Sequence, residues 1–281
     1  MSALAPVRNV LKVWLVLLGL CAVLGLIGYG IGDGDYRVVS SFVFCGLLLG
    51  LAAYLSAERM VLGMLGAREL PAAQAPDLHS SVERLSVRAG VVKPRIYVID
   101  KGPPLALAAG RGVASSAIAV TEALLLLPSP AEIEAVLAHE LAHIRRRDVL
   151  VQSTAVMLGT TIVETSRIGG FLSRALLFVL GPVASAFVHL LLSVRREFEA
   201  DALAAGFCES PHGLADALIR LEQTEELFPF ESTPATEPLY TINPFDEKGL
   251  AALFVTHPPV GERVRRLRAL DPGWREKLRA A

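Results

Sequence analysis

The sequence predicts a mainly α-helical integral membrane protein with a small β-sheet and about four transmembrane helices. Hydrophobic residues make up 53% of the 281 positions and charged residues only 20%, which is more apolar than an ordinary soluble domain. Most of the additional apolar residues lie in four stretches. These stretches form two pairs, and a polar segment with short strand-like runs lies between the pairs. The net charge of −1 disfavours binding to nucleic acid, which requires a basic face.

Two apolar runs near the N-terminus predict a transmembrane hairpin. Residues 10–31 and 38–55 are each long enough to cross a hydrocarbon core of about 30 Å, and a short link through Asp33 and Asp35 joins them. Basic residues concentrate on the outer flanks, so the positive-inside rule places both ends of the hairpin in the cytoplasm. These flanking residues are Arg8, Lys12, Arg59, Arg68, Arg84, Arg88 and Lys93, against Arg37 alone in the link.

A second pair of apolar stretches covers residues 149–163 and 171–194. Three arginines precede the pair and two follow it, so we expect another membrane hairpin that is entered and left from the cytoplasm. The first stretch is shorter than the usual minimum of about 17 residues for a spanning helix. A pair of buried helices in a soluble domain therefore remains the alternative.

The polar segments predict further helices, strands and a loop. Residues 77–90 have the pattern of an amphipathic helix, and Gly261–Ala281 that of a C-terminal helix with Leu267 and Leu270 on its apolar face. Residues 222–249 are rich in proline and predict an irregular loop. Three β-type runs would form a small sheet, with Gly110-Arg111-Gly112 joining the last two. These runs are 95–100, 105–109 and 117–121.

The segment His139-Glu140-Leu141-Ala142-His143 lies on a predicted helix with a clear start. Ser129 suits the N-cap, Pro130 the first turn, and Glu132 the reciprocal capping position. Histidines four residues apart share one face of a helix, so both imidazoles can bind one Zn²⁺ ion. Glu140 would hold the attacking water and act as general base. This pattern predicts hydrolysis with one zinc ion per chain.

Catalytic zinc requires a third protein ligand. Glu197 and Asp201 lie four residues apart on a probable helix, so one could bind the metal while the other hydrogen-bonds a ligand histidine. On spacing alone Glu197 is one of several possible ligands. If residues on both sides of the second apolar pair supply ligands, the two stretches must both cross the membrane or both not cross it.

Three motifs in this order resemble the M48 peptidases. They are His139-Glu140-Leu141-Ala142-His143-Ile144 with Arg146-Arg147-Asp148, Arg196-Glu197-Phe198-Glu199-Ala200-Asp201, and Thr256-His257-Pro258-Pro259 with Arg263. The resemblance covers nearly the whole chain and is closer to the bacterial heat-shock protease HtpX than to the Ste24 CaaX proteases. It implies a gluzincin-type zinc protease domain. It divides the chain into an N-terminal hairpin at 1–58 and a cytoplasmic peptidase domain at 59–281, interrupted by the probable membrane hairpin 149–194.

The resemblance also implies roles for individual residues. Glu197 becomes the third zinc ligand, Asp201 supports a ligand histidine from outside the metal shell, and His257 enters the active site, where it could stabilise an oxyanion. Asp148 could support the site or cap the next helix, and we favour the cap. Glu199 would point elsewhere.

The implied function is a membrane-bound zinc-dependent endopeptidase of the inner (plasma) membrane. Its substrates would be misfolded or damaged membrane proteins or other unfolded polypeptides. Two alternatives stay open: a CaaX-type processing protease and a non-catalytic zinc-containing membrane scaffold or sensor. An intact Glu140 weighs against the scaffold, because a scaffold does not need a general base.

One stretch departs from the family pattern. Members commonly carry Asn-Ala-Phe-Ala-Thr-Gly on the strand before the zinc helix, whereas residues 105–110 here read Leu-Ala-Leu-Ala-Ala-Gly. The asparagine side chain is replaced by Leu105. Such a strand can still pair a substrate through its backbone. The zinc chemistry therefore carries over from the resemblance, and the substrate preference does not.

Overall fold

A computed structural model describes residues 5–126, 129–156, 194–225 and 257–273 of the chain. Most of the predicted second membrane hairpin lies outside these residues. The predicted irregular loop beyond Glu225 and the last eight residues of the predicted C-terminal helix also lie outside them.

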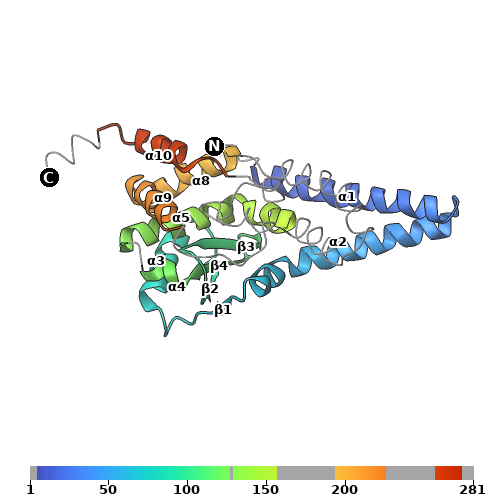
Figure 1. Cartoon of the computed structure of the whole chain (residues 1–281), viewed down its shortest axis with the longest axis horizontal. Coiled ribbons are helices and arrows are strands. Elements are labelled where there is room, and N and C mark those ends of the chain that lie inside the picture. Colours follow the sequence, from blue (N-terminus) through green and yellow to red (C-terminus); the bar gives the residue numbers. More distant parts are fainter. Residues whose placement is uncertain (1–4, 127–128, 157–193, 226–256, 274–281) are drawn as a thin grey trace.

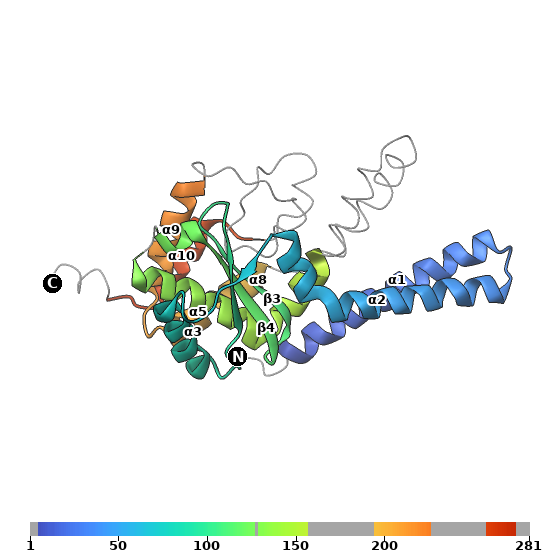
Figure 2. The ribbon, with the colours of Figure 1, turned by 90° about the horizontal axis from the view of Figure 1, so that it is seen from below.

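Two long helices form an N-terminal hairpin that projects from the rest of the molecule (Figures 1 and 2). Helix α1 spans Ala5–Ile31 and helix α2 spans Tyr36–Met64, and they pack side by side. The Asp35 side chain caps α2 by accepting a hydrogen bond from the backbone N of Arg37.

Length and composition qualify one helix of the described residues as a membrane span, at Val7–Ile31. The described part of the chain has a second if the two segments of α2, which are bent by 57° at Ala52–Tyr54, count as one span. The predicted hairpin is thus present as helices. Helix α2 continues beyond the predicted end at residue 55 because its final turns pack on the sheet described next.

A four-stranded mixed sheet has the strand order β1-β2-β4-β3. Strands β2 and β4 run parallel, with Ile96 opposite Ile118, whereas β3 pairs antiparallel to β4 and forms one edge. The strand bounds are Arg68–Glu69 for β1, Arg95–Ile99 for β2, Ala106–Gly112 for β3 and Ser115–Thr121 for β4. The three predicted strands are confirmed. Strand β1 was not predicted, because two residues carry no alternating pattern.

Both faces of the sheet are covered, as the alternation of buried side chains requires. Ala106, Ala108 and Ile118 face one core, beneath helices α3 (Pro76–Ala89) and α5 (Pro130–Arg146). Leu107 and Ala109 face the other core, which includes the end of α2 and Val156. The sheet thereby lies between the end of α2 and helix α5.

The predicted link Gly110-Arg111-Gly112 is wrong, since these residues belong to β3. Gly110 and Gly112 both have a φ of 146°, and the register with β4 shifts between them. A Cβ atom on Gly110 would lie 2.4 Å from the backbone O of Ser115. The glycines therefore allow a bulge within the strand rather than a turn after it.

Four further helices complete the domain at the end distant from the hairpin tip (Figure 1). They are α4 (Glu122–Leu126), α8 (Val194–Phe207), α9 (His212–Glu225) and α10 (Val260–Ala269). Two predictions are corrected here. The irregular loop cannot begin at Glu222, which belongs to α9. The C-terminal helix ends at Ala269, before Pro272, so Leu270 is 54% exposed instead of lying on an apolar face.

Candidate metal centre

Helix α5 begins where its capping residues predict. The Ser129 hydroxyl accepts a hydrogen bond from the backbone N of Glu132 at 3.3 Å, and the Glu132 carboxylate accepts one from the backbone N of Ser129 at 2.6 Å. The helix ends at Arg146, and its C-cap Arg147 has a φ of 58°, in the left-handed region, before helical residues resume at 148. This register turns His139, Glu140 and His143 to the buried face.

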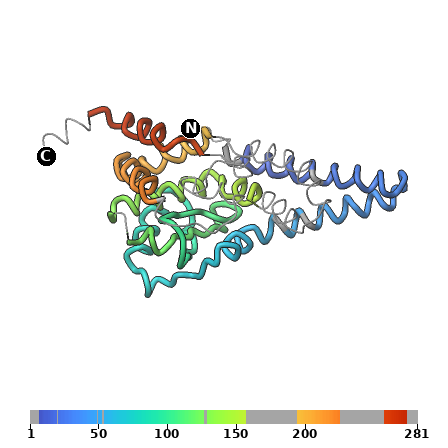
Figure 3. The backbone as a smooth tube through the Cα atoms, in the orientation of Figure 1, coloured from blue at the N-terminus to red at the C-terminus, as the bar shows by residue number. Residues whose placement is uncertain are grey.

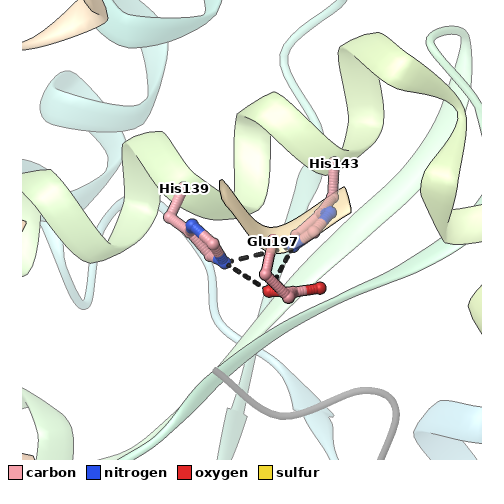
Figure 4. Close-up of side chains that lie close together, drawn as sticks. All are labelled: His139, His143 and Glu197. Atoms are coloured by element: carbon pink, nitrogen blue, oxygen red, sulfur yellow. Dashed lines mark hydrogen bonds and ion pairs between the residues drawn. The ribbon is translucent and has the colours of Figure 1, made fainter. Parts of the chain in front are cut away.

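The structure brings the predicted ligands together. The Nε2 atoms of His139 and His143 lie 3.1 Å apart. The Oε2 atom of Glu197, from the first turn of α8, lies 3.4 Å from the former and 3.5 Å from the latter (Figure 4). Helices α5 and α8 pack against each other, and all three side chains are buried.

These spacings suit a tetrahedral metal ion. Ligands at about 2.0–2.1 Å from zinc are separated by about 3.3 Å along each edge of the tetrahedron. The three edges here are 3.1, 3.4 and 3.5 Å. The Oε2 atom of Glu197 is fully buried and makes no hydrogen bond among the described residues. Because a buried polar atom without a partner is costly, the donor set fits a bound cation.

The electrostatics of the cluster favour a positive charge. Burial works to lower the pKa of His143, but the charge of Glu197 and the hydrogen bond to Asp148 outweigh it and raise the pKa to about 9. Burial likewise works to raise the pKa of Glu197, which the charges of His143 and His257 hold well below its usual range. A buried carboxylate that stays ionised can bind a cation at neutral pH.

Arg196 orients the carboxylate of Glu197. Its Nε and Nη2 atoms both donate to Oε1 of Glu197, at 3.0 and 2.8 Å. This contact leaves Oε2 directed at the two histidines. Glu199 pairs instead with Arg146 at 2.6 Å and Arg195 at 2.8 Å, and so points away from the cluster as predicted.

Asp201 and Arg263 lie beside His139, and Nη2 of Arg263 lies 3.4 Å from Nε2 of its ring. The Oδ1 atom of Asp201 lies 3.0 Å from Nδ1 of His139, on the side of the ring opposite the cluster. Arg263 donates to both carboxylate oxygens of Asp201, at 2.9 and 2.7 Å. Burial works to raise the pKa of Asp201, but Arg263 outweighs it and lowers the pKa to about 2. Asp201 thus occupies the place expected for a residue supporting a ligand.

Asp148 stands behind His143, so the structure supports the first of its two predicted roles, while residue 148 also begins the helical segment after Arg147. Its Oδ2 atom lies 3.2 Å from Nδ1 of His143 and accepts a hydrogen bond from Nε of Arg146 at 2.8 Å. The left-handed turn at Arg147 carries Asp148 back over the end of α5. Sequence spacing did not predict this contact, because it depends on the conformation of that one residue.

The two residues expected to act on substrate lie at the cluster. Glu140 follows His139 on α5 and is 2% exposed. The Nε2 atom of His257, just before α10, lies 3.6 Å from Oε2 of Glu197, and the His257 side chain is 3% exposed. The third motif is therefore adjacent to the first two, although it is remote from them in sequence.

Asn9 contacts the metal centre from α1, and sequence reasoning missed it. Its Nδ2 atom donates to Oδ1 of Asp148 at 2.7 Å and to the backbone O of Arg146 at 3.1 Å. The available signal was a lone amide beside an apolar run, since polar groups at a membrane segment are often functional.

Comparison with known proteins gives one family. The model for "Peptidase family M48" matches residues 72–271. The chain is 38% identical over 280 residues to a "Protease HtpX homolog" of Pelotomaculum thermopropionicum, covering 93% of this chain and 99% of that protein. It is 37% identical over 272 residues to a "Protease HtpX homolog" of Persephonella marina, and this match covers 90% of this chain and 94% of that protein.

A solved structure is also similar. The crystal structure of S. mikatae Ste24p aligns with a TM-score of 0.48 at 21% identity, covering 95% of this chain and 66% of that chain.

Proposed function

The chain belongs to peptidase family M48, and we propose from its site that it is a membrane-bound zinc-dependent endopeptidase. The observation that carries the proposal is the buried cluster of His139, His143 and Glu197 at the spacing of a tetrahedral metal site. Glu140 adjoins the cluster on the same helix. Two imidazoles, one carboxylate and an adjacent glutamate are the residues that peptide hydrolysis by zinc requires.

His139, His143 and Glu197 would hold one Zn²⁺ ion per chain. A zinc ion there would polarise the scissile carbonyl and lower the pKa of water towards about 7. The residues behind the ligands maintain their orientation: Asp201 holds the ring of His139, Asp148 that of His143, and Arg196 the carboxylate of Glu197.

Glu140 would transfer protons during the reaction, and His257 would stabilise the negative charge that develops on the substrate. Glu140 takes a proton from the attacking water as general base and delivers it to the leaving amine as general acid. His257 donates a hydrogen bond to the oxygen that becomes negative when the carbonyl is attacked. Both side chains are buried, so these interactions are screened little by water.

The N-terminal hairpin would anchor the enzyme in the inner membrane. Many large apolar side chains of α1 and α2 are exposed, among them Leu11, Leu18 and Leu26, as lipid contact requires. The charge pattern in the sequence places the peptidase domain in the cytoplasm. Together with the predicted hairpin 149–194, this gives a protein with about four spans.

The proposed substrates are misfolded or damaged membrane proteins and other unfolded polypeptides. Strand β3 forms the edge of the sheet and packs beside α5. A substrate that pairs with this edge must be extended, and a folded protein does not present an extended segment. Residues 106–109 of β3 are at most 1% exposed, so a substrate could pair with this edge only after the segments that cover it move aside. Such pairing would then favour unfolded chains over folded ones.

Cleavage of casein by the purified full chain tests the proposal. Wild type with zinc should cleave, and Glu140→Gln should lose cleavage by at least about 100-fold while retaining zinc, as expected for loss of a general base. Glu134→Gln is the matched control, because Glu134 lies on the same helix and pairs on its outer side with Arg84. Undiminished cleavage by Glu140→Gln would overturn the mechanism. Zinc binding without cleavage by wild type would favour the scaffold.

A further inference from the structure

Helix α1 approaches the proposed zinc site at Asn9. We propose that Asn9 is a positioning residue, which fixes the ring of the zinc ligand His143 by holding Asp148. The proposal rests on the proposed function, because it takes His143 as a zinc ligand. It adds that metal affinity depends on how α1 is seated against the peptidase domain.

Both N–H groups of the Asn9 side chain donate hydrogen bonds in this contact. An amide nitrogen carries two hydrogens, and Nδ2 of Asn9 directs them at the Asp148 carboxylate and the Arg146 backbone O, at 2.7 and 3.1 Å. Both partners can only accept, so the opposite orientation of the amide would place oxygen against oxygen. The chemistry of the partners therefore determines the orientation.

The carboxylate of Asp148 is held from two sides. Oδ1 accepts from Asn9, while Oδ2 lies 3.2 Å from Nδ1 of His143 and accepts from Arg146. Rotation of the carboxylate would break both groups of contacts at once. With Asn9 removed, Oδ1 and the carbonyl of Arg146 lose this donor in a region where Asp148 is 1% exposed. With only Oδ2 still held, by Arg146, the carboxylate would turn away from His143 more easily.

Asn9 connects two parts of the molecule that are far apart in sequence. It lies near the start of α1, which runs away from the domain along the hairpin (Figure 3). Its second hydrogen bond goes to the backbone O of Arg146, in the last turn of α5, the helix that carries both histidines. Because a residue advances a helix by about 1.5 Å, a slide of α1 by one residue would separate Asn9 from both acceptors.

The test compares zinc binding by full-length variants in detergent. Asn9→Leu fills the same space without a donor, and Asn9→Ser is a smaller change that guards against misfolding. Val16→Ala is the matched control, because Val16 is buried on α1 two turns from Asn9. Zinc affinity is measured by competition with a chelator, and ligand geometry by the visible spectrum of the Co²⁺-substituted protein.

We expect Asn9→Leu to weaken zinc binding about tenfold and to shift the Co²⁺ absorption bands. A loss of about tenfold is the lower end of the range seen when a residue that orients a metal ligand is replaced. Val16→Ala should keep the wild-type values. In peptide cleavage, kcat should fall while KM stays unchanged. If Asn9→Leu does not fold, Asn9→Ser decides in its place.

Wild-type zinc affinity and an unchanged spectrum in the Asn9 variants would overturn the inference, as would an equal loss in Val16→Ala. Failure of the proposed function would look different from failure of this inference. If the proposed function is wrong, the wild-type protein binds no zinc, or Glu197→Gln binds zinc as tightly as wild type does.

Discussion

Arg263 and Asp201 form a two-point ion pair across 62 residues of sequence, with Arg263 almost fully buried beside the candidate metal centre. The same Asp201 carboxylate lies 3.0 Å from Nδ1 of His139. The pair therefore joins α10 to a ligand on α5.

Replacing Arg263 with methionine should destabilise the protein by about 3–5 kcal/mol, because Asp201 would remain buried without its cation. Thermal unfolding of the metal-free protein measures this change. Arg265→Met on the same helix is the control: Arg265 is 76% exposed and pairs only loosely with Glu262, at 3.6 Å, so its loss should cost less than about 1 kcal/mol. Equal effects of the two substitutions would contradict the assigned role of the buried pair.

Asp148→Asn should weaken zinc binding by about 10–100-fold, as is typical when the partner of a ligand histidine loses its charge. Chelator competition measures the affinity. Glu199→Gln is the control, because Glu199 also pairs with Arg146 but does not contact a ligand. A wild-type affinity for Asp148→Asn would return Asp148 to the role of a helix cap.

Ser129→Ala should lower stability by about 1 kcal/mol without changing zinc stoichiometry or kcat. The substitution removes only the hydroxyl that accepts from the backbone N of Glu132. Calorimetry together with metal analysis separates the two quantities. A drop in kcat beyond the loss of folded protein would show that the cap also shapes the active site.

The lowered pKa of the Glu132 carboxyl group should make the stability of the fold depend on pH. Burial works to raise its pKa, but hydrogen bonds from Ser129 and Arg220 outweigh it, so the pKa lies below its usual 4.5 in the folded protein. A lowered carboxyl pKa stabilises the fold above 4.5, and this contribution is lost as pH falls through the folded pKa. The stability advantage of wild type over Glu132→Gln should therefore shrink below pH 4.5. An advantage that grows in acid would refute the assignment.

A reporter inserted at Gly34 tests the orientation of the hairpin. Gly34 lies in the short turn between α1 and α2 and has a φ of 83°, in the left-handed region that favours glycine. The charge distribution predicts that this turn faces away from the cytoplasm. An alkaline phosphatase fusion there should be active, and a fusion after Gly66 inactive. The reverse pattern would place the peptidase domain outside the cytoplasm.

Sequence alone determined the parts of this protein that depend on local physics. A helix repeats every 3.6 residues, so two histidines four apart share a face wherever that helix lies. The capping residues located the start of α5 because an N-cap acts within one turn. Three strands followed from their short β-type runs, and the N-terminal hairpin followed from length and hydrophobicity.

Only the tertiary structure decided which distant side chains hold the residues that support the metal ligands. Arg263 reaches Asp201 over 62 positions, and Asn9 reaches Asp148 over 139. Neither pairing leaves a periodic pattern, because hydrogen bonds between distant segments depend on how helices pack and not on neighbouring residues. Two local details were equally hidden, namely the left-handed turn at Arg147 and the bulge at Gly110. One backbone angle in each case redirects the chain, and it is the surrounding packing that selects the angle.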